Sequence, residues 1–191
     1  MGQYYRAVLV NREWKVKVIK PSGWKLMEHS WYGNESMNRI QKILSEDVWS
    51  VYWVWDYSKM SALVWQYKFE DVEEFGWDEE LPKEQVIDIR EDKENDYFLV
   101  NETHRQYINM SKQIKNKELF EDNFESVIHP LPLLCRNETE EAGWDYHSDV
   151  NKDLIGCWEW DEIRIIKGKE WEEYLIWHGY KDCTDFYFFK E

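Results

Sequence analysis

The sequence predicts an α+β fold, in which a mostly antiparallel, twisted sheet of about six or more strands carries a few packed helices. Two pairs of short alternating segments, at residues 3–20 and 97–110, are typical of β-hairpins. The run at residues 48–57, VWSVYWVWDY, is apolar enough for a central strand that is buried on both faces. Because 191 residues suffice for one sizeable core, we expect residues 1–191 to form a single domain.

The first hairpin is expected to join residues 3–10 to residues 13–20, with Asn11 and Arg12 as its turn. Trp14, Val16 and Val18 alternate with charged residues there, which predicts one apolar and one solvated face. After a break at residues 21–23, residues 24–29 predict a third strand. Residues 28–34 place a Glu-His pair beside two aromatics; we interpret them as a turn, with acid–base chemistry as the alternative.

A helix is expected to start at a cap formed by Asn34 or Ser36 and to end near Glu46. Its apolar residues recur at helical spacing, so one face should pack on the sheet. The central strand at residues 48–57 follows it. Residues 58–69 are ambiguous between a strand and a helix, and we favour a helix that continues to residue 75.

The second half of the chain predicts strands at residues 85–90 and 97–100, and a hairpin whose turn carries His104, which we expect to be exposed. Two prolines favour a turn at residues 129–134, with Pro132 as a candidate helix start and the leucines buried. Residues 154–166 predict a strand with Trp158 and Trp160 on one face. The tail predicts an amphipathic helix at residues 171–178 ending at Gly179, and an aromatic strand at residues 186–189.

The negative charge of the chain is concentrated in one segment. Residues 70–96 contain thirteen acidic and three basic residues, a net charge of −10 out of −15 for the whole chain. This charge disfavours duplex nucleic acid as a partner, whereas a basic protein fits. A solvated surface is the simpler interpretation, but aromatic residues among the acids favour protein binding. The candidate partner-binding residues are Glu73, Glu74, Phe75, Trp77, Asp78, Glu79 and Glu80.

The cysteines and the absence of targeting patterns indicate a reduced, cytoplasmic protein. Cys135, Cys157 and Cys183 have no metal-finger spacing and form no close pair, and we expect Cys157 to lie in the core. The opening residues lack a signal-peptide pattern, and no apolar run is long enough to cross a membrane. We therefore expect no membrane partner.

Trp-Asp dipeptides occur four times, and two of them extend to Trp-Asp-Tyr, at residues 55–57 and 144–146. Their uneven spacing excludes a propeller repeat. Asp145, His147 and Asp149 alternate, so on an extended segment they would share one face and offer metal ligands; a hydrogen-bonded loop is the alternative. No fourth ligand is evident, so no metal and no cofactor are assigned. The candidate ligand-binding residues are Asp56, Tyr57, Trp144, Asp145, Tyr146, His147 and Asp161.

Several short blocks carry a resemblance to other proteins: MGQYY at residues 1–5, residues 53–57, LVNETHRQYI at 99–108, IHPLPLL at 128–134, residues 144–146 and GCWEWDEI at 156–163. In these the chain resembles a loose group of uncharacterised bacterial and phage proteins that begin MGQYY. The resemblance implies a bacterial or phage origin and no activity. A glycine-rich loop associated with that group is replaced here by NETEEAG at residues 137–143, so no loop function is implied.

Two classes of function fit these observations. The first is a non-catalytic binding or inhibitory protein, of the immunity or counter-defence type, that engages a basic partner through an acidic, aromatic surface. It is favoured by the acidic segment, by thirteen tryptophans and by the lack of common enzyme motifs. The second is a small-ligand or nucleotide site, with metal-dependent hydrolysis as one form, in which Asp56, Asp145, His147 and Asp161 converge.

Overall fold

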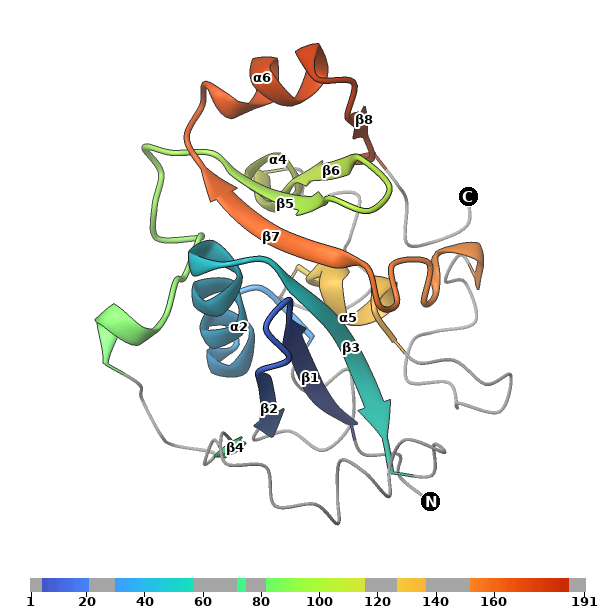
Figure 1. The fold of residues 1–191 in the computed structure, drawn as a ribbon. Coiled ribbons are helices and arrows are strands. Elements are labelled where there is room, and N and C mark those ends of the chain that lie inside the picture. Colours follow the sequence, from blue (N-terminus) through green and yellow to red (C-terminus); the bar gives the residue numbers. More distant parts are fainter. Residues whose placement is uncertain are drawn as a thin grey trace.

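The computed structural model describes residues 5–20, 30–56, 72–74, 82–115, 127–136 and 152–185. Within these residues one twisted sheet of eight strands has the order β4-β2-β1-β3-β7-β5-β6-β8 (Figure 1). Its strands are β1 (Tyr5–Asn11), β2 (Val16–Lys20), β3 (Trp49–Trp55), β4 (Val72–Glu74), β5 (Tyr97–Asn101), β6 (Gln106–Asn109), β7 (Glu162–Lys167) and β8 (Lys181–Asp182). The helices are α2 (Glu35–Glu46), α4 (Met110–Lys115), α5 (Pro130–Leu134) and α6 (Trp171–Trp177), with short 3-10 turns η1 (Lys83–Gln85) and η3 (Lys152–Leu154).

The predicted α+β class with a mostly antiparallel sheet is confirmed. The pairs β2–β4 and β6–β8 at the two ends of the sheet are parallel, and the other neighbours are antiparallel. The central strand predicted at residues 48–57 is β3, which lies between β1 and β7. Its side chains are buried on both faces except at Ser50, as the apolar run requires.

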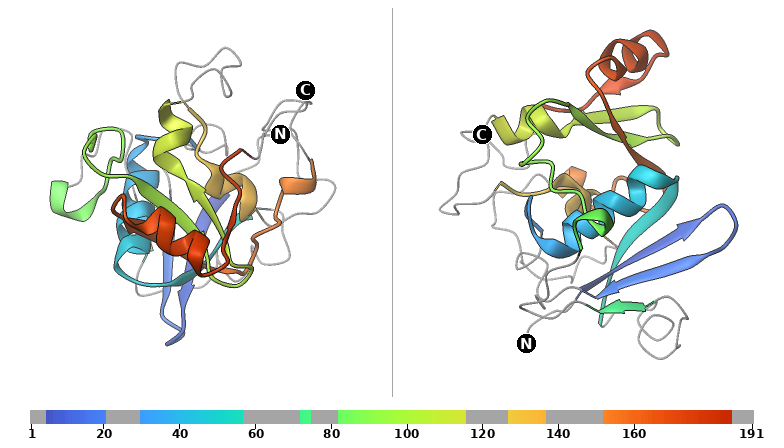
Figure 2. Two further views of the ribbon diagram at one scale, coloured as in Figure 1. Left: turned by 90° about the horizontal axis from the view of Figure 1, so that it is seen from above. Right: turned by 90° about the vertical axis from the view of Figure 1, so that its left-hand side faces the viewer.

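Both predicted hairpins form, and the first one has a longer turn than expected. Asn11 still belongs to β1, where it pairs with Trp49 of β3, and its backbone N–H donates to the carbonyl of Lys15, so residues 12–15 form the loop. Trp14 lies in this loop and is exposed, so its predicted place on an apolar strand face was wrong. Figure 2 shows the β1–β2 hairpin extending outward, with this loop at its outer end.

The predicted helix at residues 34–46 is confirmed as α2. The Asn34 side chain caps it by accepting a hydrogen bond from the Ser36 backbone N–H, which satisfies one of the unpaired donors at the helix start. Met37, Ile40 and Leu44 are buried. The apolar stripe therefore packs into the core, as its spacing predicts.

Four other sequence predictions require correction. Val72–Glu74 is a strand beside β2, not part of a helix. Residues 85–90 form no strand; their chain docks on α2, where the Ile87 N–H donates to the Asn38 carbonyl, and this contact replaces sheet pairing. The strand expected at residues 154–166 begins only at Glu162, because turns at residues 155–160 precede it. The helix at residues 129–134 begins at Pro130 rather than Pro132 because the His129 side chain caps it.

The predicted leucine burial in α5 is confirmed. The amphipathic tail helix is confirmed as α6, which ends before Gly179 at a positive φ of 77°. The strands predicted at residues 24–29 and 186–189 lie outside the described residues, as do residues 58–71 and 75 of the predicted helix.

The two faces of the sheet are covered differently. One face, here the α2 face, carries the main core, in which Trp53 of β3 is fully buried with residues of α2, α4 and α5. The other face, here the α6 face, carries two separate apolar clusters. One lies on β1, β2 and β3 around Tyr52, and the other lies on β5, β6 and β7 beneath Leu175 of α6. Polar side chains of β7 occupy the strip between them, because Glu162 and Arg164 alternate with the core residues Ile163 and Ile165.

Candidate ligand-binding cleft

A cleft of about 310 Å³ opens where the β1–β2 loop and the start of β3 meet the turn before β7. Two tryptophans, one from each loop, contribute to its walls together with an arginine and a glutamate. Its lining residues are Val10, Asn11, Arg12, Trp14, Val48, Ser50, Trp160 and Glu162. The cleft combines aromatic walls with a few polar groups, which is the composition of ligand sites.

Trp14 is presented to solvent by a loop that Asn11 organises. The Asn11 side-chain oxygen accepts hydrogen bonds from the backbone N–H groups of Glu13 (3.0 Å) and Lys15 (2.9 Å), and the Asn11 carbonyl accepts from Trp14 (3.0 Å). Trp14 is 84% exposed and has a φ of 62°. The loop is therefore fixed by hydrogen bonds, whereas the indole that it carries gains little from packing.

Trp160 is presented by a second ordered turn. Trp158, two residues earlier, is buried, and its indole N–H donates to Gln106 Oε1 at 2.8 Å while its backbone N–H donates to the Leu134 carbonyl. Trp160 follows at a φ of 68° and is 50% exposed, with its ring centroid 3.9 Å from that of Tyr52. One edge of the cleft is thus an indole packed, with tilted ring planes, against Tyr52 on the surface of β3.

The backbone at Trp14 and Trp160 is unusual for bulky residues. The left-handed region costs an L-residue about 1–2 kcal/mol, and such strain concentrates at functional sites. Arg105 is the third non-glycine residue with positive φ among those described, and it lies in the β5–β6 turn. Two strained and exposed tryptophans therefore line one cleft, and neither is explained by core packing.

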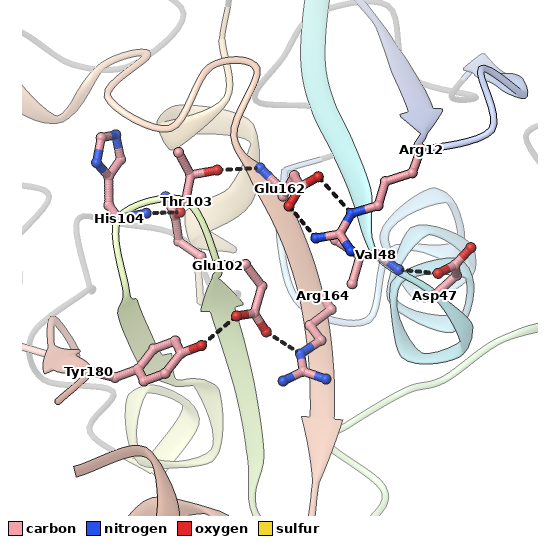
Figure 3. A network of polar contacts seen from close by, with 10 residues as sticks. Arg12, Asp47, Val48, Glu102, Thr103, His104, Glu162, Arg164 and Tyr180 are labelled. Atoms are coloured by element: carbon pink, nitrogen blue, oxygen red, sulfur yellow. Dashed lines mark hydrogen bonds and ion pairs between the residues drawn. The ribbon is translucent and has the colours of Figure 1, made fainter. Parts of the chain in front are cut away.

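An ion pair crosses the cleft between Arg12 and Glu162, which are 150 residues apart in the chain (Figure 3). Arg12 Nε donates to Glu162 Oε1 at 2.8 Å and Arg12 Nη2 donates to Oε2 at 2.6 Å, a two-pronged geometry. The hydrogen bonds and charge of Arg12 lower the pKa of Glu162, and Glu162 in turn raises the pKa of Arg12. The carboxylates of Glu102 and Asp47 raise the Arg12 pKa further, so the guanidinium lies in negative surroundings.

The backbone of Glu162 is held in place by the neighbouring turn. Its N–H donates to Thr103 Oγ1 at 2.9 Å, and its carbonyl accepts from the Glu102 N–H at 2.8 Å. Glu102 also forms an ion pair with Arg164 Nε at 2.5 Å and accepts a hydrogen bond from the Tyr180 hydroxyl (Figure 3). This polar strip fixes the carboxylate side of the cleft through β5, β7 and the segment after α6.

Carboxylates predominate around the cleft. Burial raises the pKa of Tyr52 to about 12, and the nearby charge of Glu159 adds to this effect. Glu13 lies in the same loop as Trp14, where it pairs with Lys15 at 2.7 Å. A cationic ligand is favoured in these surroundings, and a phosphate group would be repelled by the carboxylates of Glu13, Asp47, Glu159 and Glu162.

The comparisons decide no family. Neither a family model, nor a curated protein, nor a solved structure matches this chain. The resemblance to proteins that begin MGQYY thus stays an expectation from sequence.

Two of the ligand-binding residues predicted from sequence are described, and they are not brought together. Asp56 follows the end of β3, whereas Asp161 precedes Glu162, which pairs with Ser50 near the start of β3. Asp56 lies six positions beyond Ser50, which is about 20 Å along an extended strand. Asp161 is instead buried; it accepts a hydrogen bond from Asn101 Nδ2 at 2.8 Å and contacts His104 Nε2 at 3.2 Å. The remaining candidates lie outside the described residues: Tyr57, Trp144, Asp145, Tyr146 and His147.

The predicted partner-binding segment is described only in part. The backbones of Glu73 and Glu74 form part of β4, and Phe75, Trp77, Asp78, Glu79 and Glu80 lie outside the described residues. Further along the acidic segment, several carboxylates are neutralised within the chain itself. Asp88 pairs with Arg90, Asp92 with Lys167 at 2.7 Å, and Asp96 with Lys115 at 3.5 Å.

Other candidate chemistries find less support in the described part of the chain. Its His, Cys, Asp and Glu side chains form no group of three that could hold a metal ion. Its helices include none that is both long and apolar enough to span a bilayer. Cys157 is an exposed residue and does not lie in the core. Its thiol is nevertheless partly desolvated, which together with the charge of Asp161 raises its pKa to about 11, so it is a poor nucleophile at neutral pH.

Sequence reasoning missed the cleft because its residues come from distant loops. Trp14 and Trp160 were assigned to strand faces, and Arg12 and Glu162 carried no motif. A signal was nevertheless present, since thirteen tryptophans exceed what the core of a small domain can bury. Trp14 and Trp160 are two tryptophans that line a surface cleft instead of the core.

Proposed function

We propose that this protein is a non-catalytic binding protein whose partner is basic, and that the cleft between Trp14 and Trp160 is its contact site. The observation that carries the proposal is the pair of exposed, strained indoles lining one cleft. Indole faces attract cations, and each such contact contributes about 0.5–2 kcal/mol, depending on desolvation. A cationic side chain therefore matches both the walls and the surrounding carboxylates.

The acidic segment at residues 70–96 has a complementary role in the proposal. The net charge of −10 there is offset only in part by Lys167 and Lys115 from outside the segment, so it attracts a basic partner over distances near the Debye length, which raises the association rate more than the final affinity. Short-range selection would then take place in the cleft. The same negative surroundings disfavour the alternative of a nucleotide ligand, because phosphate groups would be repelled.

A direct binding measurement tests the proposal. Fluorescence anisotropy of a labelled hexa-arginine peptide should show saturable binding to the wild-type protein, with weaker binding at higher salt. The Trp14→Ala/Trp160→Ala double variant should bind about tenfold more weakly, the loss expected when two cation–π contacts are removed. Trp177→Ala is the matched control, since Trp177 is 82% exposed on α6 and does not line the cleft.

The two variants separate the cleft from general aromatic stickiness. Removal of Trp177 should leave the peptide affinity unchanged. Equal affinities of the wild type and the double variant would refute the cleft as the contact site. A binding curve that does not depend on salt would refute a basic partner.

A further inference from the structure

Arg12 occupies a position in the cleft that an external cation could take. Its guanidinium donates hydrogen bonds to both oxygens of Glu162. The Arg12 side chain is nevertheless 70% exposed, compared with 36% for that of Glu162. Exposed ion pairs of this kind are weak, because water competes for both partners. The contact is therefore readily exchanged.

The two halves of this ion pair differ in how firmly they are held. Glu162 begins β7, pairs with Ser50, and has both its backbone N–H and its carbonyl bonded to the β5–β6 turn. Arg12 lies in the loop at the outer end of the β1–β2 hairpin (Figure 2); the backbone of this loop is hydrogen-bonded, but the long Arg12 side chain is 70% exposed. The carboxylate is thus a fixed acceptor, and the guanidinium is the component that can leave.

The geometry points to an exchange of cations at Glu162. We propose that Arg12 occupies the subsite in the free protein and that an arginine side chain of the basic partner enters between Trp14 and Trp160, displaces Arg12 and takes over its two hydrogen bonds to Glu162. This inference rests on the proposed function and names the side chain that the cleft selects. An arginine is preferred to a lysine because a planar guanidinium matches a carboxylate in two-pronged fashion and stacks on indole, whereas an ammonium binds as a point charge.

The displaced Arg12 would remain in favourable surroundings. The carboxylates of Asp47 and Glu102 also act on its charge, so its release from Glu162 does not leave it without negative groups nearby. Arg12 still loses its strongest partner, because Glu162 acts on its charge more than Glu102 or Asp47 does. The cation–π contacts of the incoming arginine with two indoles offset this loss and supply the preference for the bound state.

Two glutamine variants in the same loop test the exchange. Arg12→Gln and Lys15→Gln each remove one positive charge from the β1–β2 loop, but Lys15 pairs with Glu13 and does not contact Glu162. A general electrostatic effect would strengthen hexa-arginine binding equally in both variants. Vacating Glu162 should give Arg12→Gln an additional gain of about twofold to fivefold over Lys15→Gln, the range expected from losing a competing exposed ion pair.

Further variants complete the cycle. Glu162→Gln should weaken hexa-arginine binding and should abolish the additional gain of Arg12→Gln when the two are combined. Wild-type protein should bind hexa-arginine more tightly than hexa-lysine, and Glu162→Gln should reduce that difference. Arg12→Lys keeps the positive charge but loses the planar guanidinium that donates to both oxygens of Glu162. Its affinity for hexa-arginine should therefore lie between those of wild type and Arg12→Gln.

The outcomes distinguish the two proposals. If Arg12→Gln binds no more tightly than Lys15→Gln while Trp14→Ala/Trp160→Ala loses binding, the exchange is refuted and the proposed function stands. If Arg12→Gln weakens binding, Arg12 itself contacts the ligand and the exchange is again refuted. If the tryptophan variants bind as wild type does, the proposed function fails together with the inference.

Discussion

His129 should make the folded protein sensitive to mild acid. Its ring is fully buried, packs on Tyr32 at 4.6 Å between centroids, and accepts a hydrogen bond at Nδ1 from the Leu131 N–H (3.1 Å) as the cap of α5. Burial lowers its pKa from 6.5 to about 3, so the imidazole stays neutral in the folded state over the range in which an exposed histidine gains a proton.

The sign of the effect follows from proton uptake. Below pH 6.5 the unfolded chain protonates His129 and the folded chain does not, so the free energy of unfolding falls as the pH falls from about 6.5 to about 3. At pH 5.0, which is about 1.5 units below the unfolded pKa, the loss amounts to about 2 kcal/mol. Above pH 7.5 the contribution of protonation vanishes.

Urea denaturation at pH 7.5 and pH 5.0 measures this loss. We compare wild type with His129→Asn, because asparagine is also a good helix cap and does not titrate. The wild type should lose about 2 kcal/mol more than the variant between the two pH values. Asp92, whose pKa a hydrogen bond from Lys167 holds low, also destabilises in acid, but it is present in both proteins and cancels in the difference.

An NMR titration of the wild type tests the same reasoning without relying on a variant. The ring protons of His129 should show no protonation shift between pH 7.5 and pH 5.0. Titration near pH 6.5, or equal losses of stability in wild type and variant, would refute the assignment of a neutral buried imidazole.

Three further predictions follow from the local structure. Trp14→Gly should raise the free energy of unfolding by up to about 1 kcal/mol in urea, because glycine relieves the positive φ, whereas Trp53→Ala in the core should lower it by about 3–5 kcal/mol. Asn34→Ala should cost about 1 kcal/mol through loss of the α2 cap, and Asn34→Ser should restore most of it. Alkylation of Cys157 by iodoacetamide should be slow at pH 7.4, and its rate should rise about tenfold per pH unit until about pH 11. Cys157→Ser provides the blank for this measurement.

Local patterns in the sequence predicted much of the fold. The apolar stripe and cap of α2, the two hairpins and the continuous apolar run of β3 each depend on neighbouring residues, and each was confirmed. The strand predicted around Ile87 and Ile89 was wrong because the alternation of apolar residues there reflects packing against α2. The backbone of this segment is bonded to Asn38 instead of to a strand. Periodicity reports which side chains are buried, not what their backbone pairs with.

The candidate cleft was beyond local patterns. It requires β1 and β7 to lie on either side of β3, which brings Arg12 to Glu162 across 150 residues. Strand order depends on long-range pairing that a single sequence does not reveal. The positive φ of Trp14 and Trp160 was equally hidden, since tryptophan is among the residues least expected to adopt it.

The short parallel strands at the two ends of the sheet restrict how another chain can attach. The outermost strands in the described part of the chain are β4, with three residues, and β8, with two, and both residues of β8 are charged and exposed. Such short edge strands offer few free backbone N–H and C=O groups, and charged residues at the edge of the sheet disfavour edge-to-edge aggregation. Partners that extend the sheet by adding a strand would find little template there, so recognition through side chains on the surface of the sheet is the mode that this architecture leaves open.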